Sequence, residues 1–333
     1  MIDKNSASSS SNNNDFIDEE VKIGSEEVEG KKPYEYTTLQ TKKDERRAKT
    51  ARILSNTLAY SVLILLTIIW LYPIFWIVVH AFRGADPVTG AYRGIVISNY
   101  FPGSYGIEAF RRLFTETYFL RWFVNTLFVA VLTCFFATML QLSVAYVMSK
   151  LKFPQRRFFL NLAIILGLFP GFMSMIAIYY ILKAFGLTET LFALVLVYSA
   201  GAGLGFYIAK GFFDVIPNSL IEAARLDGAT NAKIFSLIVL PISKPIIVYT
   251  ALMTFTAPWF DFLFARVILG ETNTEIHTVA VGLYMMLYGP QADVSMFTVF
   301  AAGSVLVAVP IVTLFLSMQR YYVEGVTSGA VKG

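Results

Sequence analysis

Residues that could bind a metal or form a covalent intermediate are scarce in this chain of 333 residues. It holds one cysteine, Cys134, and two histidines, His80 and His277, which lie far apart in the sequence. A lone cysteine cannot form an intrachain disulfide or a cysteine-based metal site, and the histidines lack the spacing of a ligand pair. No Gly-x-x-x-x-Gly-Lys-Ser/Thr phosphate loop occurs, so any ATP hydrolysis must come from another chain. We therefore predict no enzyme activity, no metal site and no bound cofactor.

Asp261 is an isolated carboxylate in an apolar stretch, two residues after Trp259. Inside a membrane span a carboxylate costs at least about 2.5 kcal/mol on insertion scales, so it should face protein or water. Asp261 could line a path and accept hydrogen bonds from the hydroxyl groups of a substrate, with the Trp259 ring stacked on that substrate. Alternatively, Asp261 pairs with Arg266 or caps a helix break after Pro258, and this structural role is the interpretation that we favour.

Residues 212–245 predict a small folded segment between two apolar stretches. Ser219 to Glu222 fits a capping box, with serine as N-cap and glutamate three positions later. The first helix is expected to run to Asp227, and Gly228 is the residue type that tolerates a left-handed helix end. The pattern indicates a short capped helix.

A second helix is predicted to follow at once. Thr230 can cap it, and it is expected to run through Leu240 until Pro241 ends it. The neighbouring Ala223 and Ala224 would give the first helix a surface that another molecule can approach closely. The segment is therefore either a docking site for a partner protein or an amphipathic loop that lies on lipid headgroups.

The composition indicates that these residues belong to a membrane protein. Hydrophobic residues make up 56% of the chain and charged residues 15%, against about 25% charged in a typical globular protein. Residues 1–50 hold 9 of the 27 Lys and Arg and 11 of the 23 Asp and Glu. Residues 51–333 are thus only about 11% charged, too little to cover a water-soluble surface. A soluble enzyme, a nucleic-acid binder and a secreted disulfide scaffold are all poor fits.

The chain divides into two parts of different character. Residues 1–50 are rich in Ser, Asn, Glu and Lys, and we predict a disordered tail there. Residues 51–333 predict an all-α polytopic membrane domain, because the apolar runs are too long for barrel strands. A helix needs about 20 residues to cross a bilayer. The six predicted transmembrane helices are residues 57–80, 122–148, 158–182, 190–211, 246–268 and 296–318.

The basic residues predict how these spans are oriented. Counted in alternate loops, Lys and Arg are more than twice as frequent on the side of residues 1–50 and 212–245 as on the other side. Cytoplasmic loops carry the excess of Lys and Arg. We therefore predict a multi-pass protein of the cell membrane, in contact with lipid, with both termini in the cytoplasm.

The segment between the fourth and fifth spans resembles the EAA loop of ABC importer permeases. It consists of Glu222-Ala223-Ala224-Arg225-Leu226-Asp227-Gly228, followed by Ile238-Val239-Leu240-Pro241. The EAA pattern has a glycine four residues after the second alanine and ends on a hydrophobic residue, leucine and proline. Residue identity, spacing and position before the penultimate span all match.

The resemblance extends over essentially all of residues 51–333 and narrows to MalG-type subunits of carbohydrate importers, in the binding-protein-dependent transport system inner membrane component family. The segments similar to that group are residues 122–127, 171–176, 258–262 and 321–333. Residues 1–50 depart from it, so the resemblance gives them no role.

What the resemblance implies is a transporter of several chains. A second, MalF-type permease subunit forms the translocation path with such a chain, and an extracytoplasmic solute-binding protein delivers the sugar. Two cytoplasmic ABC ATPase subunits use ATP and Mg²⁺ and dock on the EAA loops. The residues that would couple the ATPases to this chain are Glu222, Ala223, Ala224, Asp227, Gly228 and Pro241. A second ATPase contact would involve Gly329, Ala330, Val331, Lys332 and Gly333.

We therefore predict the permease subunit of an ABC importer for an oligosaccharide of the maltose or maltodextrin class. Trp259 and Asp261 are its candidate path residues. A permease for another oligosaccharide, such as galactooligosaccharides, is the near alternative. An ion-coupled secondary transporter is an alternative of a different class, but it would usually carry several ionisable residues within its spans, where Asp261 is nearly alone.

Overall fold

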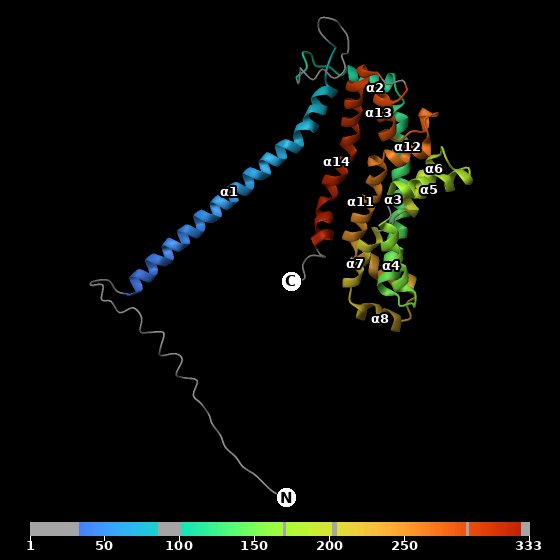
Figure 1. The fold of residues 1–333 in the computed structure, drawn as a ribbon. Coiled ribbons are helices and arrows are strands. Elements are labelled where there is room, and N and C mark those ends of the chain that lie inside the picture. The colour runs from blue at the N-terminus through green and yellow to red at the C-terminus, as the bar shows by residue number, and fades with distance from the viewer. Residues whose placement is uncertain (1–32, 86–100, 169–170, 202–204, 291–292, 328–333) are drawn as a thin grey trace. The chain divides into compact units, whose positions relative to one another are not determined.

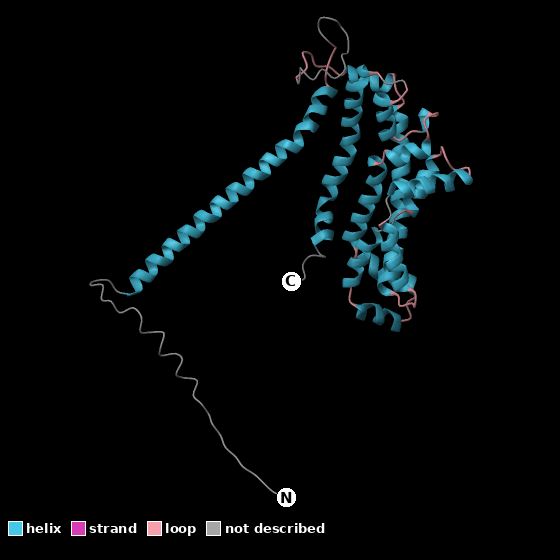
Figure 2. Cartoon of the chain, viewed as in Figure 1, coloured by secondary structure: helices cyan, strands magenta, loops and turns pink. Residues whose placement is uncertain are grey.

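A computed structural model describes residues 33–85, 101–168, 171–201, 205–290 and 293–327 of the chain. These residues form helices, and among them no strand occurs beyond one isolated bridge between Arg83 and Tyr105 (Figures 1 and 2). The prediction of an all-α fold is confirmed. The chain divides into two compact units, a first unit of Met1–Leu71 and a second unit of Tyr72–Gly333.

The helices of the described residues are labelled in Figure 1 where space allows. The α-helices are α1 (Pro33–Ala81), α2 (Glu108–Thr115), α3 (Phe119–Lys150), α4 (Arg156–Gly167), α5 (Gly171–Ala184), α6 (Leu191–Ala200), α7 (Gly205–Val215), α8 (Asn218–Leu226), α9 (Asn231–Ile234), α10 (Leu240–Ile242), α11 (Lys244–Phe260), α12 (Leu263–Leu269), α13 (Val279–Tyr288) and α14 (Phe297–Thr327). A π-helix, η1 (Phe235–Val239), and two 3₁₀-helices, η2 (Thr274–Ile276) and η3 (Val294–Met296), complete them.

Helix α1 begins inside the segment that we predicted to be disordered. Residues 1–32 of that segment lie outside the described residues, but residues 33–50 are helical, so the prediction is wrong for them. A helix that has already formed extends by one hydrogen bond per residue without the cost of a new nucleus. The apolar run from Thr57 supplies the formed helix, and good helix formers such as Lys42 and Lys43 continue it towards the N-terminus.

Three helical stretches are long and apolar enough to cross a membrane alone, namely Arg46–Ala81, Phe119–Lys150 and Phe297–Gln319. The count rises to six if each of three bent helix pairs is taken as one span. Helices α4 and α5 meet at 101°, and α6 and α7 meet at 41°. The six spans that we predicted therefore match the larger of the two counts. The spans predicted at residues 158–182 and 190–211 correspond to bent helix pairs.

The fifth predicted span, residues 246–268, also differs from the structure. Helix α11 ends at Phe260 and α12 starts at Leu263, so the predicted span contains a break near Asp261. The third bent pair instead joins Asn231–Ile242 to α11 at 89°. Residues 246–260 of the predicted span therefore lie in α11, whose first residues follow a sharp bend, and residues 263–268 lie in α12.

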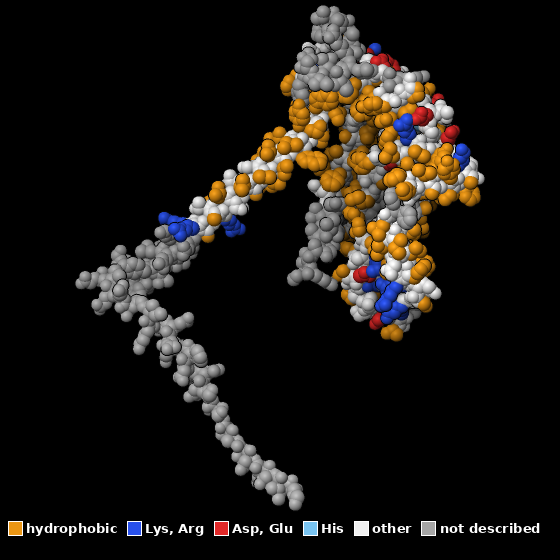
Figure 3. Space-filling model, viewed as in Figure 1, with side chains coloured by type: hydrophobic (Ala, Val, Ile, Leu, Met, Phe, Trp, Pro, Cys, Tyr) orange, Lys and Arg blue, Asp and Glu red, His pale blue; other side chains and the backbone are white. Residues whose placement is uncertain are grey.

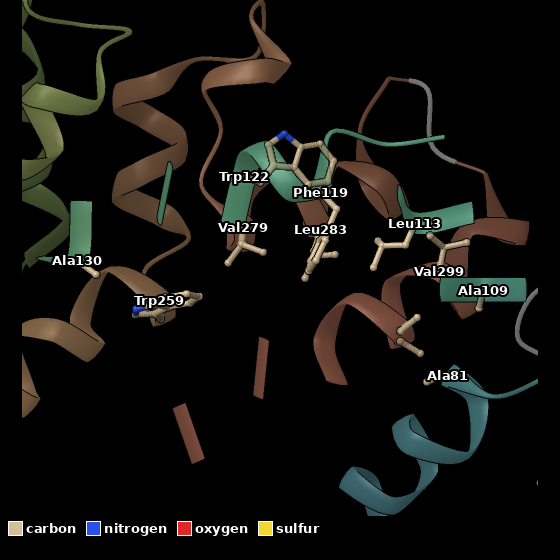
Figure 4. Packing of buried hydrophobic residues seen from close by; sticks show 12 residues of the cluster. Ala81, Ala109, Leu113, Phe119, Trp122, Ala130, Trp259, Val279, Leu283 and Val299 are labelled. Atoms are coloured by element: carbon tan, nitrogen blue, oxygen red, sulfur yellow. The ribbon is translucent and has the colours of Figure 1, made fainter. Parts of the chain in front are cut away.

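Helix α3 is the central element of the second unit, because α6, α7 and α11 all pack against it. At its start, the Trp122 ring lies on α13, where a Cβ added at Gly282 would come within 2.2 Å of the ring. Only glycine fits this contact. Trp122 packs with Phe119, Val279 and Leu283 in a hydrophobic cluster of the second unit (Figure 4).

Hydrogen bonds fix the same end of α3. The Trp122 indole N–H donates to the carbonyl of Thr274 at 2.7 Å, and the Asn125 amide donates to the carbonyls of Glu275 and His277 at 2.8 and 3.0 Å. The Thr126 hydroxyl accepts a hydrogen bond from the backbone N–H of Val279 at 2.8 Å. Residues 122–127 therefore hold α3 to the loop before α13.

Candidate functional site

Helix α8 begins without the predicted capping box. It starts at Asn218, and the N-cap residue is Pro217, whose side chain makes no capping hydrogen bond. The prediction of Ser219 as N-cap is therefore wrong. The Lys150 ammonium fixes this end instead, because it donates to the carbonyl of Ile216 at 2.6 Å and to Asn218 Oδ1 at 3.1 Å.

The two faces of α8 have different surroundings. Ile221 and Ala224 are buried, and they pack into a hydrophobic cluster with residues of α3 and α7. The opposite face is exposed, and we name it the docking face; its residues are Ser219, Glu222, Ala223 and Leu226. Positions three, four and seven apart share one side of a helix, which is why these four lie together.

The predicted surface of paired alanines is therefore wrong in part. Ala223 is exposed on the docking face, but Ala224 is buried beneath it. Leu226 is 89% exposed at the end of this face. No sequence pattern singles out Leu226, because the exposure of one leucine depends on which side of the helix packs against the protein.

The C-terminal end of α8 is closed by a Schellman motif. Gly228 has a φ of +80°, its N–H donates to the carbonyl of Arg225 at 3.0 Å, and the Ala229 N–H donates to the carbonyl of Ala224 at 2.9 Å. These are the two hydrogen bonds of the motif. Asp227 is the C-cap residue. The prediction that Gly228 takes a left-handed conformation is confirmed.

The second helix of the segment is capped as predicted but ends differently. The Thr230 hydroxyl accepts a hydrogen bond from the backbone N–H of Lys233 at 3.4 Å, which confirms the predicted cap. Pro241, however, does not end the helix. The π-helix η1 precedes it and the helix continues to Ile242 before the bend at Ser243. Proline is tolerated at the first turn of a helix, where no intrahelical N–H partner is lost.

Asp261 lies in the break between α11 and α12. Its Oδ2 accepts a hydrogen bond from the Tyr198 hydroxyl at 2.5 Å, and its Oδ1 accepts one from the backbone N–H of Phe264 at 3.1 Å. Asp261 therefore caps the break, as one of our two interpretations predicted. The predicted pair with Arg266 is wrong, because Arg266 forms an ion pair with Glu271.

A cavity of about 420 Å³ lies beside the Tyr198 end of this contact. Helices α3, α5, α6, α11 and α12 contribute to its walls. Its polar lining residues are Thr133, Gln141, Ser174, Tyr198 and Thr254, and the rest of the lining is mainly apolar. Hydroxyl and amide groups on an apolar wall suit a neutral polyhydroxyl ligand.

Trp259 does not line this cavity. Its side chain is 4% exposed and packs against Phe123 and Phe255 in the cluster shown in Figure 4. The ring is not available to stack on a sugar in this conformation, so the structure contradicts the role predicted for Trp259. Ala257, two residues before Trp259 on α11, lines the cavity, because residues two apart point to nearly opposite sides of a helix.

The remaining predicted site residues, 329–333, lie outside the described residues. Among the described residues, no group of three or more His, Cys, Asp or Glu side chains could hold a metal ion. Sequence reasoning missed Tyr198, which is the hydrogen-bond partner of Asp261. Its signal was weak but present, because a tyrosine hydroxyl inside an apolar helix needs a partner.

Comparison with known proteins agrees with this arrangement. Residues 141–328 match the family described as "Binding-protein-dependent transport system inner membrane component". The maltodextrin transport system permease protein MdxG of Bacillus subtilis (strain 168) is 33% identical over 287 residues, which cover 86% of this chain and 99% of the relative. The galactooligosaccharides transport system permease protein GanQ of the same organism is 28% identical over 289 residues, which cover 86% and 98%.

A solved structure shares the fold. It is the crystal structure of a bacterial ABC transporter involved in the import of the acidic polysaccharide alginate, and one of its chains matches with a TM-score of 0.69 and 23% identity over 82% of this chain and 98% of that chain. The match places the helices of this chain in an ABC transporter fold. Because the family pattern covers more than half of the sequence and a 33% identical relative matches along nearly its whole length, this chain belongs to the binding-protein-dependent transport system inner membrane component family.

Proposed function

We propose that this chain is a permease subunit of an ABC importer and that it forms, with a second, MalF-type permease subunit, the translocation path for an oligosaccharide of the maltose or maltodextrin class. The observation that carries the proposal is the 33% identity to a maltodextrin permease over 99% of that relative. The family description supports delivery of the sugar by a solute-binding protein. The sugar class is transferred from the relative.

The docking face of α8 is the proposed contact with a cytoplasmic ATPase subunit. Leu226 projects from it at 89% exposure, and burying a leucine side chain contributes about 1.5–3 kcal/mol. Ala223 allows a close approach, and Glu222 offers a carboxylate to a basic partner.

Three residues would shape the docking segment without touching the ATPase subunit themselves: Asp227, Gly228 and Pro241. Gly228 and Asp227 close the helix end that presents Leu226. Pro241 lies between η1 and the bend at Ser243, where the segment turns into α11. Residues 329–333 would form a second contact with the ATPase pair.

The proposed orientation has both termini and α8 in the cytoplasm. The excess of Lys and Arg on that side supports it. In the first unit, the side chains of residues 53–71 are exposed and mostly apolar, and Figure 3 shows hydrophobic side chains along the described part of α1. A surface of this kind needs lipid or the second permease subunit to cover it.

The cavity beside Tyr198 is the proposed portion of the sugar path in this chain. Gln141, Ser174 and Thr254 offer amide and hydroxyl groups that can exchange hydrogen bonds with sugar hydroxyls. Asp261 positions another lining residue, because it accepts the hydrogen bond of the Tyr198 hydroxyl. No cofactor is assigned to this chain, and ATP and Mg²⁺ would be bound by the ATPase subunits.

Reconstitution in proteoliposomes tests the proposal. The chain is purified with its co-expressed permease, ATPase and binding-protein partners, and ATP hydrolysis is measured with maltodextrin or with galactooligosaccharide. We expect maltodextrin to stimulate hydrolysis and uptake. Stimulation by galactooligosaccharide alone would favour the second candidate, which the 28% identical relative supports. Uptake driven by an ion gradient without ATP would refute an ABC importer.

A further inference from the structure

A second cavity, of about 450 Å³, lies on the flank of α8 beside the docking face. It is enclosed by the end of α3, the connection from α3 to α4, the start of α4 and one side of α8. Four of its lining side chains are basic and one is acidic; the basic ones are Lys150, Lys152, Arg156 and Arg225, and the acidic one is Glu222. Figure 3 shows Lys and Arg side chains gathered at the end of the second unit that carries α8.

The positive charge of this cavity is only partly offset within the described part of the chain, by Glu222 in its lining and by the attraction of Asp214 to Lys150. Lys150 is nearly buried and donates to neutral oxygens of Ile216 and Asn218. Arg225 donates to the neutral amide oxygen of Asn231 at 3.3 Å. Among the described residues, no carboxylate forms an ion pair with any of the four basic side chains.

Asp214, near the end of α7, is already bound to two other side chains. Asp214 accepts from the Lys210 ammonium at 2.6 Å through one oxygen and from the Ser149 hydroxyl at 2.6 Å through the other. It therefore cannot turn to the cavity without giving up both bonds. Lys152 and Arg225 are exposed and Arg156 is half-buried, so water solvates them, but like charges around one cavity repel each other and a bound anion would relieve that repulsion.

The surface that follows the cavity along α4 is largely apolar. A smaller hollow of about 370 Å³ lies between them; it shares Lys152, Phe153 and Arg156 with the cavity, and Pro154 and Arg157 complete its lining. Helix α4 starts here and has no buried residue, and its Phe158 and Phe159 side chains are 61% and 46% exposed. A ligand with a phosphate at one end and hydrocarbon at the other fits both surfaces, whereas free phosphate would leave the apolar one uncovered.

We propose that this cavity binds the phosphate of an anionic phospholipid headgroup, with the acyl chains of that lipid along α4. Lys152 and Arg156 line both hollows, so they hold the phosphate on the side of the cavity where α4 begins and its exposed apolar side chains follow. Lys150 from α3 and Arg225 from α8 add two positive charges on the other sides of the cavity, and these charges also attract the phosphate. The lipid would come from the cytoplasmic leaflet if the protein has the orientation that we propose above. The binding of the phosphate does not depend on that orientation.

The test uses the full chain, purified in detergent with the subunits that accompany it and stripped of lipid. Native mass spectrometry then measures the binding of phosphatidylglycerol and of phosphatidylcholine. Each basic residue near a membrane surface contributes about 1 kcal/mol to anionic lipid binding, which is about fivefold in affinity. We expect Lys152→Gln to weaken the tightest phosphatidylglycerol site about fivefold, and Lys152→Gln with Arg156→Gln to weaken it about 30-fold.

The matched control is Lys49→Gln with Arg52→Gln, which removes the same charge from exposed side chains of α1. We expect it to leave the tightest site unchanged. The single variant, at an exposed side chain, keeps the test valid if the double variant fails to fold. Equal loss in the control, or no loss in either cavity variant, would overturn the proposal.

Two further outcomes identify a different ligand. Displacement of phosphatidylglycerol by millimolar inorganic phosphate would show that free phosphate is the natural occupant, and it would overturn the lipid. Unchanged lipid binding together with loss of the ATPase subunit from the cavity variants would assign the cations to a protein contact. Transport is not measured, so failure here is distinct from failure of the proposed function.

Discussion

Replacing Gly228 by valine isolates the contribution of the α8 helix end to docking. Gly228 has a φ of +80°, and nothing lies within 4 Å of a Cβ placed there. The added side chain therefore meets no steric obstacle, and the cost is confined to the backbone conformation. A non-glycine residue held in the left-handed region costs about 1–3 kcal/mol, and a β-branched residue lies at the upper end of that range.

That cost falls on the conformation that presents Leu226 and Glu222. If the helix end relaxes, the Schellman bonds from Gly228 and Ala229 are lost and the docking-competent population drops by about 5–150-fold. The assay is sugar-stimulated ATP hydrolysis by the reconstituted complex as a function of ATPase-subunit concentration. We expect a higher concentration for half-maximal activity, with normal membrane insertion.

Gly228→Asn is the matched control, because asparagine tolerates the left-handed conformation. It fills the same open space and should keep most of the activity. Normal stimulated hydrolysis in the valine variant would refute the docking assignment. Equal loss in both variants would refute the conformational reasoning, since it would show that any side chain at this position blocks the partner.

Leu226→Ala should weaken ATPase-subunit binding by about 1.5–3 kcal/mol in a titration, whereas Leu220→Ala, outside the docking face, should weaken it much less. Asp261→Ala should lower the thermal stability in detergent by about 1–3 kcal/mol because it leaves two donors unpaired, and a loss of uptake without that destabilisation would indicate a direct sugar contact instead. Burial lowers the pKa of the His277 imidazole below its ordinary value of 6.5, so its stabilising contribution is present above pH 6.5 and is lost as the pH falls through the lowered pKa; acid sensitivity of the melting temperature should be smaller in His277→Gln. Deleting residues 1–45 should leave uptake nearly unchanged, and loss of uptake in a fully assembled complex would contradict this.

The parts of α8 that the sequence predicted are those governed by local geometry. A left-handed helix end requires a residue such as Gly228, and an N-cap requires a side chain such as Thr230, so residue type alone is informative. The start of α8 could not be predicted in this way. Its terminus is held by Lys150, which lies 68 residues earlier than Asn218, and no local pattern reports a contact of that separation.

The interior of the second unit shows the same limit. Hydrophobicity predicted that Asp261 must face protein or water, and the structure provides both a hydroxyl and a backbone N–H. Which hydroxyl it meets depends on how α6 packs against α12, because Tyr198 is 63 residues away. Trp259 was misassigned for a related reason, since the side of α11 that faces the core is set by neighbouring helices.

Two adjacent alanines of the EAA segment connect different parts of the protein. Ala223 faces outward on the docking face, whereas Ala224 is buried in the cluster that contains Leu142 and Tyr146 of α3. Helix α3 continues from that cluster to Gln141 in the cavity wall and further to its anchored start at Trp122. A displacement of α8 by a partner therefore acts on a continuous helix that also lines the proposed sugar path. Since Ile221 and Ala224 are buried and packed, and packed interiors resist compression, α8 and the end of α3 are expected to move together rather than independently.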